Sequence, residues 1–181
     1  MNIDQINKAI EKASPGLIKY LSIMDRFNQV DVTQDEDFQR MYNGFYRVRQ
    51  RKEEFYKKYF SFMQANKNDK PSFEKTLLYF YDELGRVEAS FSSKLIATIN
   101  PYLPVWDSIV LQNLNLKKPQ TYSKNRIEET VDLYNEIVVW YENFTISEEG
   151  KQIIHLFNNK YPETDITDVK KVDFVLWQTR E

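Results

Sequence analysis

Lys94 is the residue of this sequence best suited to nucleophilic chemistry, because its neighbours in the chain are apolar. It lies in residues 90–110, which read SFSSKLIATINPYLPVWDSIV, with Phe91, Leu95 and Ile96 close to it. An amine in apolar surroundings loses the hydration of its charged form, which lowers the pKa of a lysine. A neutral lysine amine can form a Schiff base with a carbonyl-type carbon. The segment therefore makes Lys94 a candidate nucleophile.

Asp107 is the carboxylate that could work with Lys94, which precedes it by 13 residues. A helix, a turn containing proline and the start of a second helix can bring the two side chains together. We expect their ends within roughly 4–8 Å, with Phe91 or Trp106 beside them as residues of a substrate pocket. The alternative, which the spacing alone favours, is that Lys94 extends to water along its own stem while Asp107 only caps a helix.

Two basic clusters could contact a polyanion. The first lies in residues 47–58 and alternates with aromatic residues, a pattern that a solvated helix face over an aromatic core explains better. The second lies in and after a loop, where the backbone can approach a polyanion closely. This second cluster is the predicted nucleic-acid contact, and it consists of Lys117, Lys118, Lys124 and Arg126.

The hydrophobic periodicity predicts an all-α protein. Apolar residues recur at three- and four-residue steps, the four glycines are too few for a protein of tight hairpins, and the six prolines fall between the periodic stretches. We expect residues 1–181 to form a single compact multi-helix domain. The expected helices cover residues 3–12, 17–29, 35–65, 73–84, 87–99, 108–116, 123–144, 148–159 and 166–178, with 35–65 and 123–144 the longest.

Composition excludes several classes of chemistry. The 181 residues carry a net charge of −2, which excludes a strongly basic coat but not a local basic patch. The chain has no cysteine and a single histidine, His155, which removes disulfides, thiolate metal sites and a three-histidine metal centre. No run of about 18 apolar residues occurs, and the N-terminal residues lack the apolar block of a signal peptide. We therefore expect a cytoplasmic protein with no membrane partner.

Residues 84–114 resemble the helix-hairpin-helix DNA glycosylase superfamily, and within it the 8-oxoguanine DNA glycosylase branch. In that branch a lysine begins the second helix of a hairpin, and an aspartate follows in a Pro-hydrophobic-Asp stretch that opens another helix. Lys94 and Asp107 stand in these places here. The phrases SSKLIATINPYLPVWDSIV and KKVDFVLW, the latter at residues 170–177, are similar to short bacterial members.

The resemblance implies a DNA glycosylase-like fold and a repair reaction on damaged double-stranded DNA. An oxidised purine such as 8-oxoguanine would be flipped out of the duplex into a pocket among the helices. Lys94 would attack the sugar C1′ atom, and Asp107 would stabilise the developing positive charge and assist proton transfer. The Schiff base would then permit strand nicking, with no metal or organic cofactor.

One departure from the family supports a second interpretation. The family's Gly-rich hairpin, of the form LPGVG, offers backbone N–H groups to DNA phosphate, and residues 85–93 replace it here with GRVEASFSS. The second interpretation is a non-catalytic all-α module on a glycosylase-like scaffold that binds DNA or protein. Lys94 and Asp107 favour the enzyme, the absent hairpin favours the module, and a helical protein unrelated to either is a third alternative.

Overall fold

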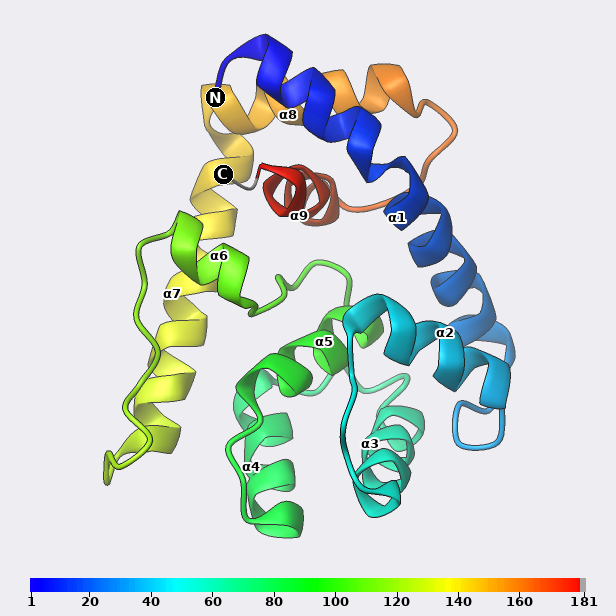
Figure 1. Cartoon of the computed structure of the whole chain (residues 1–181), viewed down its shortest axis with the longest axis vertical. Coiled ribbons are helices and arrows are strands. Elements are labelled where there is room, and N and C mark those ends of the chain that lie inside the picture. The colour runs from blue at the N-terminus through cyan, green and yellow to red at the C-terminus, as the bar shows by residue number, and fades with distance from the viewer. Residues whose placement is uncertain (180–181) are drawn as a thin grey trace. The chain divides into compact units, whose positions relative to one another are not determined.

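The computed structural model describes residues 1–179, and within this range the protein is helical without any strand (Figure 1). The predicted all-α class is therefore confirmed. The helices are α1 (Ile3–Gln29), α2 (Glu36–Tyr46), α3 (Glu53–Ala65), α4 (Phe73–Leu84), α5 (Ala89–Ile99), α6 (Ser108–Asn113), α7 (Arg126–Ile146), α8 (Glu148–Lys160) and α9 (Asp168–Gln178).

The chain divides into two compact units, which we describe separately. Unit 1 comprises Met1–Ser14 and the chain from Pro101 onward, and unit 2 comprises Pro15–Asn100. The expectation of a single domain over residues 1–181 stays a prediction.

Helix α9 is the centre of unit 1. Figure 1 views it end-on, with α6, α7 and α8 around it, and all three helices pack against it. Every residue from Lys170 to Leu176 is buried, although this stretch includes three charged side chains. Thr167 caps the helix by accepting a hydrogen bond from the Lys170 backbone N–H, and its hydroxyl donates to the Pro101 carbonyl at 2.7 Å. This contact ties the beginning of α9 to the beginning of the segment that leads to α6.

Unit 2 is organised around stacked aromatic rings and a chain of hydroxyl hydrogen bonds. Tyr59 of α3 donates its hydroxyl proton to the Phe91 carbonyl of α5 at 2.9 Å, so the Tyr42 hydroxyl of α2 is the donor across the 2.8 Å contact with Tyr59. Burial raises the pKa of both phenols, which keeps the two protons in place. This series of hydrogen bonds connects α2, α3 and the first turn of α5, and it fixes the position of the helix that carries Lys94.

The two helices expected on either side of Pro15 are one helix, α1, so that prediction was wrong. Proline removes one backbone donor and normally breaks or kinks a helix. Here the buried stripe keeps its phase across the proline, since Ile10, Ala13, Leu17 and Tyr20 follow one another at three- and four-residue steps and all are buried. The burial of one continuous apolar face outweighs the missing hydrogen bond.

The single long helix expected over residues 35–65 is also wrong, because α2 and α3 are separate. Arg47 ends α2 in the left-handed conformation with φ 54°, and Gln50 has φ 58°. Between them Val48 is buried, and its carbonyl accepts a hydrogen bond from the Tyr56 hydroxyl at 3.2 Å. Left-handed backbone normally carries glycine, so no residue type marks this break in the sequence.

Two glycines should respond oppositely to alanine. At Gly150, in the first turn of α8, an added Cβ would overlap the backbone carbonyl of Phe144 at the α7–α8 junction. At Gly44, in the exposed interior of α2, nothing lies within 4 Å of such a Cβ. We expect Gly150→Ala to lower the free energy of unfolding by about 1–3 kcal/mol. Gly44→Ala should raise it by about 0.5–1 kcal/mol. Urea titrations of both variants check this, and equal effects would contradict it.

Candidate functional site

Lys94 lies in the buried part of α5. The residues from Ser92 to Ile99 are all buried, and only 9% of Lys94 is exposed. Its Nζ atom lies 5.3 Å from the centre of the Phe91 ring, so the structure brings together these two predicted site residues. A side chain that escaped to water along its own stem would be exposed at its end. The burial of Lys94 is the environment that a lysine nucleophile requires.

Phe91 also contacts a partly buried ion pair that the sequence did not reveal. The Arg51 guanidinium lies 4.8 Å from the Phe91 ring centre and pairs with the Glu88 carboxylate at 3.4 Å. Arg86 reaches the same carboxylate at 3.3 Å, and Glu88 is buried. Arg51 belongs to the basic cluster of residues 47–58, which was expected on a solvated helix face, and no role was expected for Glu88. A glutamate next to the first turn of an apolar helix was the only available signal.

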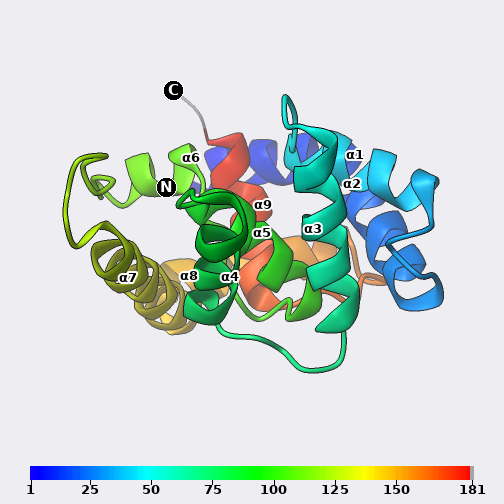
Figure 2. The same cartoon turned by 90° about the horizontal axis from the view of Figure 1, so that it is seen from below.

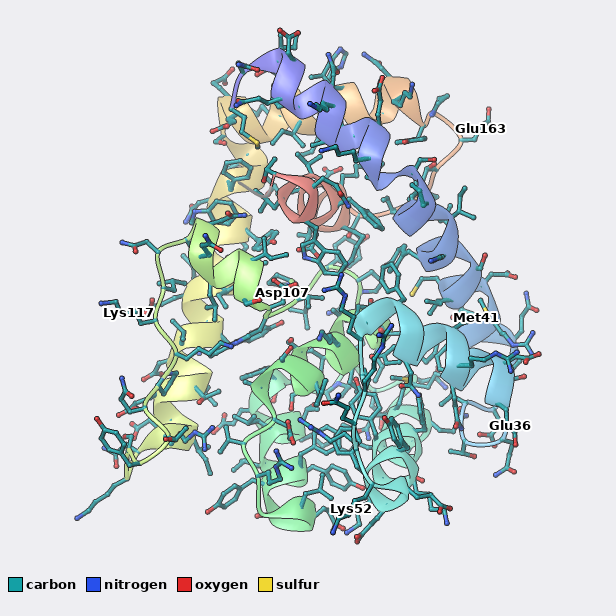
Figure 3. All side chains as sticks on the ribbon, in the orientation of Figure 1. Glu36, Met41, Lys52, Asp107, Lys117 and Glu163 are labelled. Carbon is teal, nitrogen blue, oxygen red and sulfur yellow. The ribbon has the colours of Figure 1, made fainter. Side chains whose placement is uncertain are left out.

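Asp107 is the N-terminal cap of α6 (Figure 3). Its Oδ1 atom accepts hydrogen bonds from the backbone N–H groups of Ile109 at 2.8 Å and Val110 at 3.0 Å. The helix start expected at this residue is therefore confirmed. The two bonds use one carboxylate oxygen and fix the orientation of the group, which is half-buried.

The segment before Asp107 is held in the interior of unit 1. Pro104, Val105 and Trp106 are all buried, and the Tyr134 hydroxyl of α7 donates to the Pro104 carbonyl at 2.9 Å. The Trp106 ring is therefore enclosed. The hydrogen bond from α7 and the burial of residues 104–106 hold the backbone just before Asp107. Packing within unit 1 therefore sets the position of the aspartate.

A buried charge network lies beside Asp107. The Asp173 carboxylate of α9 accepts hydrogen bonds from the Tyr141 hydroxyl at 2.7 Å and from Lys170 Nζ at 2.9 Å. Lys170 is 2% and Asp173 1% exposed, and such groups are rarely buried unless they are paired. Burial first, then Asp173 and Asp107, raise the pKa of Tyr141, so Asp107 lies within electrostatic reach of the network.

Sequence reasoning missed this network for a definite reason. Tyr141 lies in the helix expected over residues 123–144, at three- and four-residue steps from Tyr134 and Val138, a spacing that predicts a core side chain. Residues 170–177 were noted only for the resemblance. The signal was nevertheless present, because Lys170, Lys171 and Asp173 interrupt the stretch 169–177 of α9, whose other residues are apolar. Charged residues at buried helical positions indicate a paired network.

Lys94 belongs to unit 2 and Asp107 to unit 1. Their predicted approach to within a few ångströms stays a prediction, as do the roles of Phe91 and Trp106 as pocket residues.

The basic cluster predicted to contact nucleic acid lies on the connection between α6 and α7 and on the first residue of α7. Lys117, Lys118 and Lys124 are exposed and Arg126 is half-buried. Figure 3 shows Lys117 pointing away from the helices. Within residues 1–179 none of the four forms an ion pair. Their charges are therefore available to an external anion.

No family model, curated protein or solved structure matches this chain. In the part of the chain that the structure describes, no three or more His, Cys, Asp or Glu side chains are grouped to hold a metal ion. No helix among residues 1–179 has the length and apolar character needed to cross a membrane.

Proposed function

We propose that the protein is a DNA glycosylase and AP lyase that removes an oxidised purine such as 8-oxoguanine from double-stranded DNA. The observation that carries the proposal is the burial of Lys94 within a buried stretch of α5, beside the Phe91 ring. Burial of an amine favours its neutral form, which is the nucleophile in Schiff-base chemistry. The resemblance of residues 84–114 to the helix-hairpin-helix glycosylases supplies the class of reaction.

Lys94 would act in two consecutive steps. Its neutral Nζ attacks the sugar C1′ atom, the C1′–N9 bond breaks with its electron pair going to the purine, and the purine takes up a proton. The nitrogen then loses a proton, the C1′–O4′ bond opens with protonation of O4′, and an iminium ion remains on Lys94. Loss of a C2′ proton expels the 3′ phosphate and nicks the strand. These steps need no oxidant and no cofactor.

Asp107 would supply electrostatic stabilisation. As the purine leaves, positive charge develops on the sugar, and an oriented carboxylate stabilises it without having to reorganise. The two backbone N–H groups on Oδ1 supply that orientation. The hydrogen bond from the Tyr134 hydroxyl to the Pro104 carbonyl fixes the backbone three residues before Asp107.

The Asp107→Asn variant tests this role. Asparagine caps a helix about as well as aspartate, so the fold should be kept while the charge is lost. We expect single-turnover release of 8-oxoguanine to slow by about 10²–10³-fold, with duplex affinity unchanged within about twofold. Asp107→Ala is the control for the cap, because it should also lower the free energy of unfolding by about 1 kcal/mol. Base release by the asparagine variant at the wild-type rate would contradict the role of Asp107.

One observation favours the second candidate, a non-catalytic all-α module that binds DNA or protein. Glu88 is buried directly before the first turn of α5, in the segment that replaces the family's Gly-rich hairpin. Arg51 and Arg86 both pair with this carboxylate, so the cations of the segment are engaged by Glu88 and not by a DNA phosphate. A wild-type protein that binds lesion-containing duplex at low salt but releases no base would support this candidate.

The cytoplasmic location and the lack of a cofactor stay predictions.

A further inference from the structure

We propose that the connection between α6 and α7 binds unpaired nucleotides of a DNA strand, with Tyr122 stacking on a base and the surrounding cations holding phosphates. The inference rests on the proposed function only in taking DNA as the partner.

Tyr122 is presented to solvent by a turn. Its exposed fraction is 83%, among the highest of the large apolar or aromatic side chains. The Ser123 backbone N–H donates to the Gln120 carbonyl at 3.1 Å, which closes a turn with Thr121 and Tyr122 at its two central positions. Side chains at the centre of such a turn project outward. The exposure of the ring therefore follows from the backbone of the connection.

The turn is anchored to α7 at its far end. The Ser123 hydroxyl donates to the Glu129 carboxylate at 2.7 Å and accepts from the Asn125 backbone N–H at 3.2 Å. These bonds hold the turn against the first turn of the helix. Anchoring reduces the entropy that Tyr122 would lose on binding a partner. It also occupies the Glu129 carboxylate, the second acidic residue after the connection.

The charged residues of the connection itself are all cations. Residues 108–127 contain four cations, Lys117, Lys118, Lys124 and Arg126, and neither aspartate nor glutamate. Figure 2 shows the α6–α7 connection arching outward from α6 and α7. A chain with net charge −2 thus carries a local positive surface around an exposed ring.

This combination fits a single strand better than a membrane or an apolar protein surface. Among residues 1–179, the exposed large apolar or aromatic side chains include one in the α6–α7 connection, that of Tyr122. A membrane or an apolar protein surface would need several such side chains side by side. Base stacking needs one aromatic face for each base, and cations hold the backbone. In an intact duplex both faces of a base are covered by its neighbours. The preferred partner is therefore a strand with unpaired bases.

The test compares binding of a fluorescein-labelled oligothymidine strand of about 12 nucleotides with binding of a duplex of the same length, by anisotropy at several salt concentrations. We expect Tyr122→Ala to weaken strand binding about tenfold, because the variant loses the stacking of the ring on an unpaired base. Duplex binding should change less, because the bases of a duplex are already stacked on their neighbours. Tyr122→Phe should bind as the wild type does, because it keeps the ring. Tyr102→Ala is the matched control, since Tyr102 is 71% exposed and residues 95–116 contain no cation.

Charge is tested separately. The double variant Lys117→Gln and Lys118→Gln should reduce the slope of log affinity against log salt for the strand by about 1.4, or about 0.7 for each phosphate contact. The double variant Lys151→Gln and Lys160→Gln on α8 changes the net charge equally and should leave the slope unchanged.

Each outcome decides the inference independently of catalysis. If Tyr122→Ala binds the strand as tightly as the wild type, or if the wild type does not bind it at low salt, the inference is wrong even where base release is observed. If strand binding depends on Tyr122 while no base is released, the inference stands and the proposed reaction fails.

Discussion

Replacement of Lys94 by methionine should abolish both strand nicking and covalent trapping on duplex DNA that contains 8-oxoguanine or an abasic site. The variant removes the amine that forms the Schiff base, and loss of a covalent nucleophile costs at least about 10³-fold in rate. Methionine is unbranched and similar in length to lysine, so the buried space in α5 stays filled. Lys94→Ala should give the same loss of activity and a lower stability, because it leaves a cavity. Nicking and borohydride trapping are read on denaturing gels.

Lys171 provides the matched control for this variant. It has the same exposed fraction as Lys94, 9%, and its Nζ atom pairs with Asp168 at 2.8 Å on α9. Lys171→Met should therefore retain nicking and trapping on the same duplexes. If Lys94→Met remained active, or if both variants lost activity to the same extent, Lys94 would not be the nucleophile.

Asp173→Ala should be strongly destabilising, with a loss of about 3–5 kcal/mol in the free energy of unfolding. The carboxylate is buried and accepts hydrogen bonds from both Tyr141 and Lys170. Removing it takes away the negative charge that pairs with a buried ammonium group. Urea unfolding followed by circular dichroism measures the loss.

A second substitution separates charge from packing in this network. When Lys170→Met is combined with Asp173→Ala, the buried positive charge is removed as well, and part of the stability should return. Tyr141→Phe alone should cost about 1–2 kcal/mol, because it removes one hydrogen bond to a charged acceptor. A loss below 1 kcal/mol for Asp173→Ala would show that the pair contributes little to unit 1.

The helix boundaries that could be predicted from the sequence are those marked by a capping residue. Ser72, Asp107 and Ser147 directly precede the helices expected over residues 73–84, 108–116 and 148–159, and each accepts a hydrogen bond from the first turn of the helix observed there. The boundaries that could not be predicted depend on tertiary packing. The proline in α1 is bridged by a continuous buried face, and the break after α2 uses left-handed arginine where glycine would be expected.

In the candidate site, too, the features that depend on local sequence could be predicted and those that depend on tertiary packing could not. The apolar neighbours of Lys94 in the sequence correctly indicated a buried lysine, since local helix periodicity decides which residues lie inside. Asp173 and Glu88 each also have a distant partner, Tyr141 at a separation of 32 residues and Arg51 at 37. Pairing over such separations is decided by the packing of helices, which composition and spacing do not encode.

The most direct test of the central claim is to locate the covalent bond. Wild-type protein should be reduced with borohydride on a duplex containing 8-oxoguanine, digested with nuclease and trypsin, and analysed by mass spectrometry. Trypsin does not cleave after a modified lysine, so an adduct on Lys94 joins residues 87–94 and 95–117 into one peptide that carries the sugar remnant. We expect that peptide from the wild type and its absence from Lys94→Met. An adduct on another amine, or no adduct at all, would contradict this expectation.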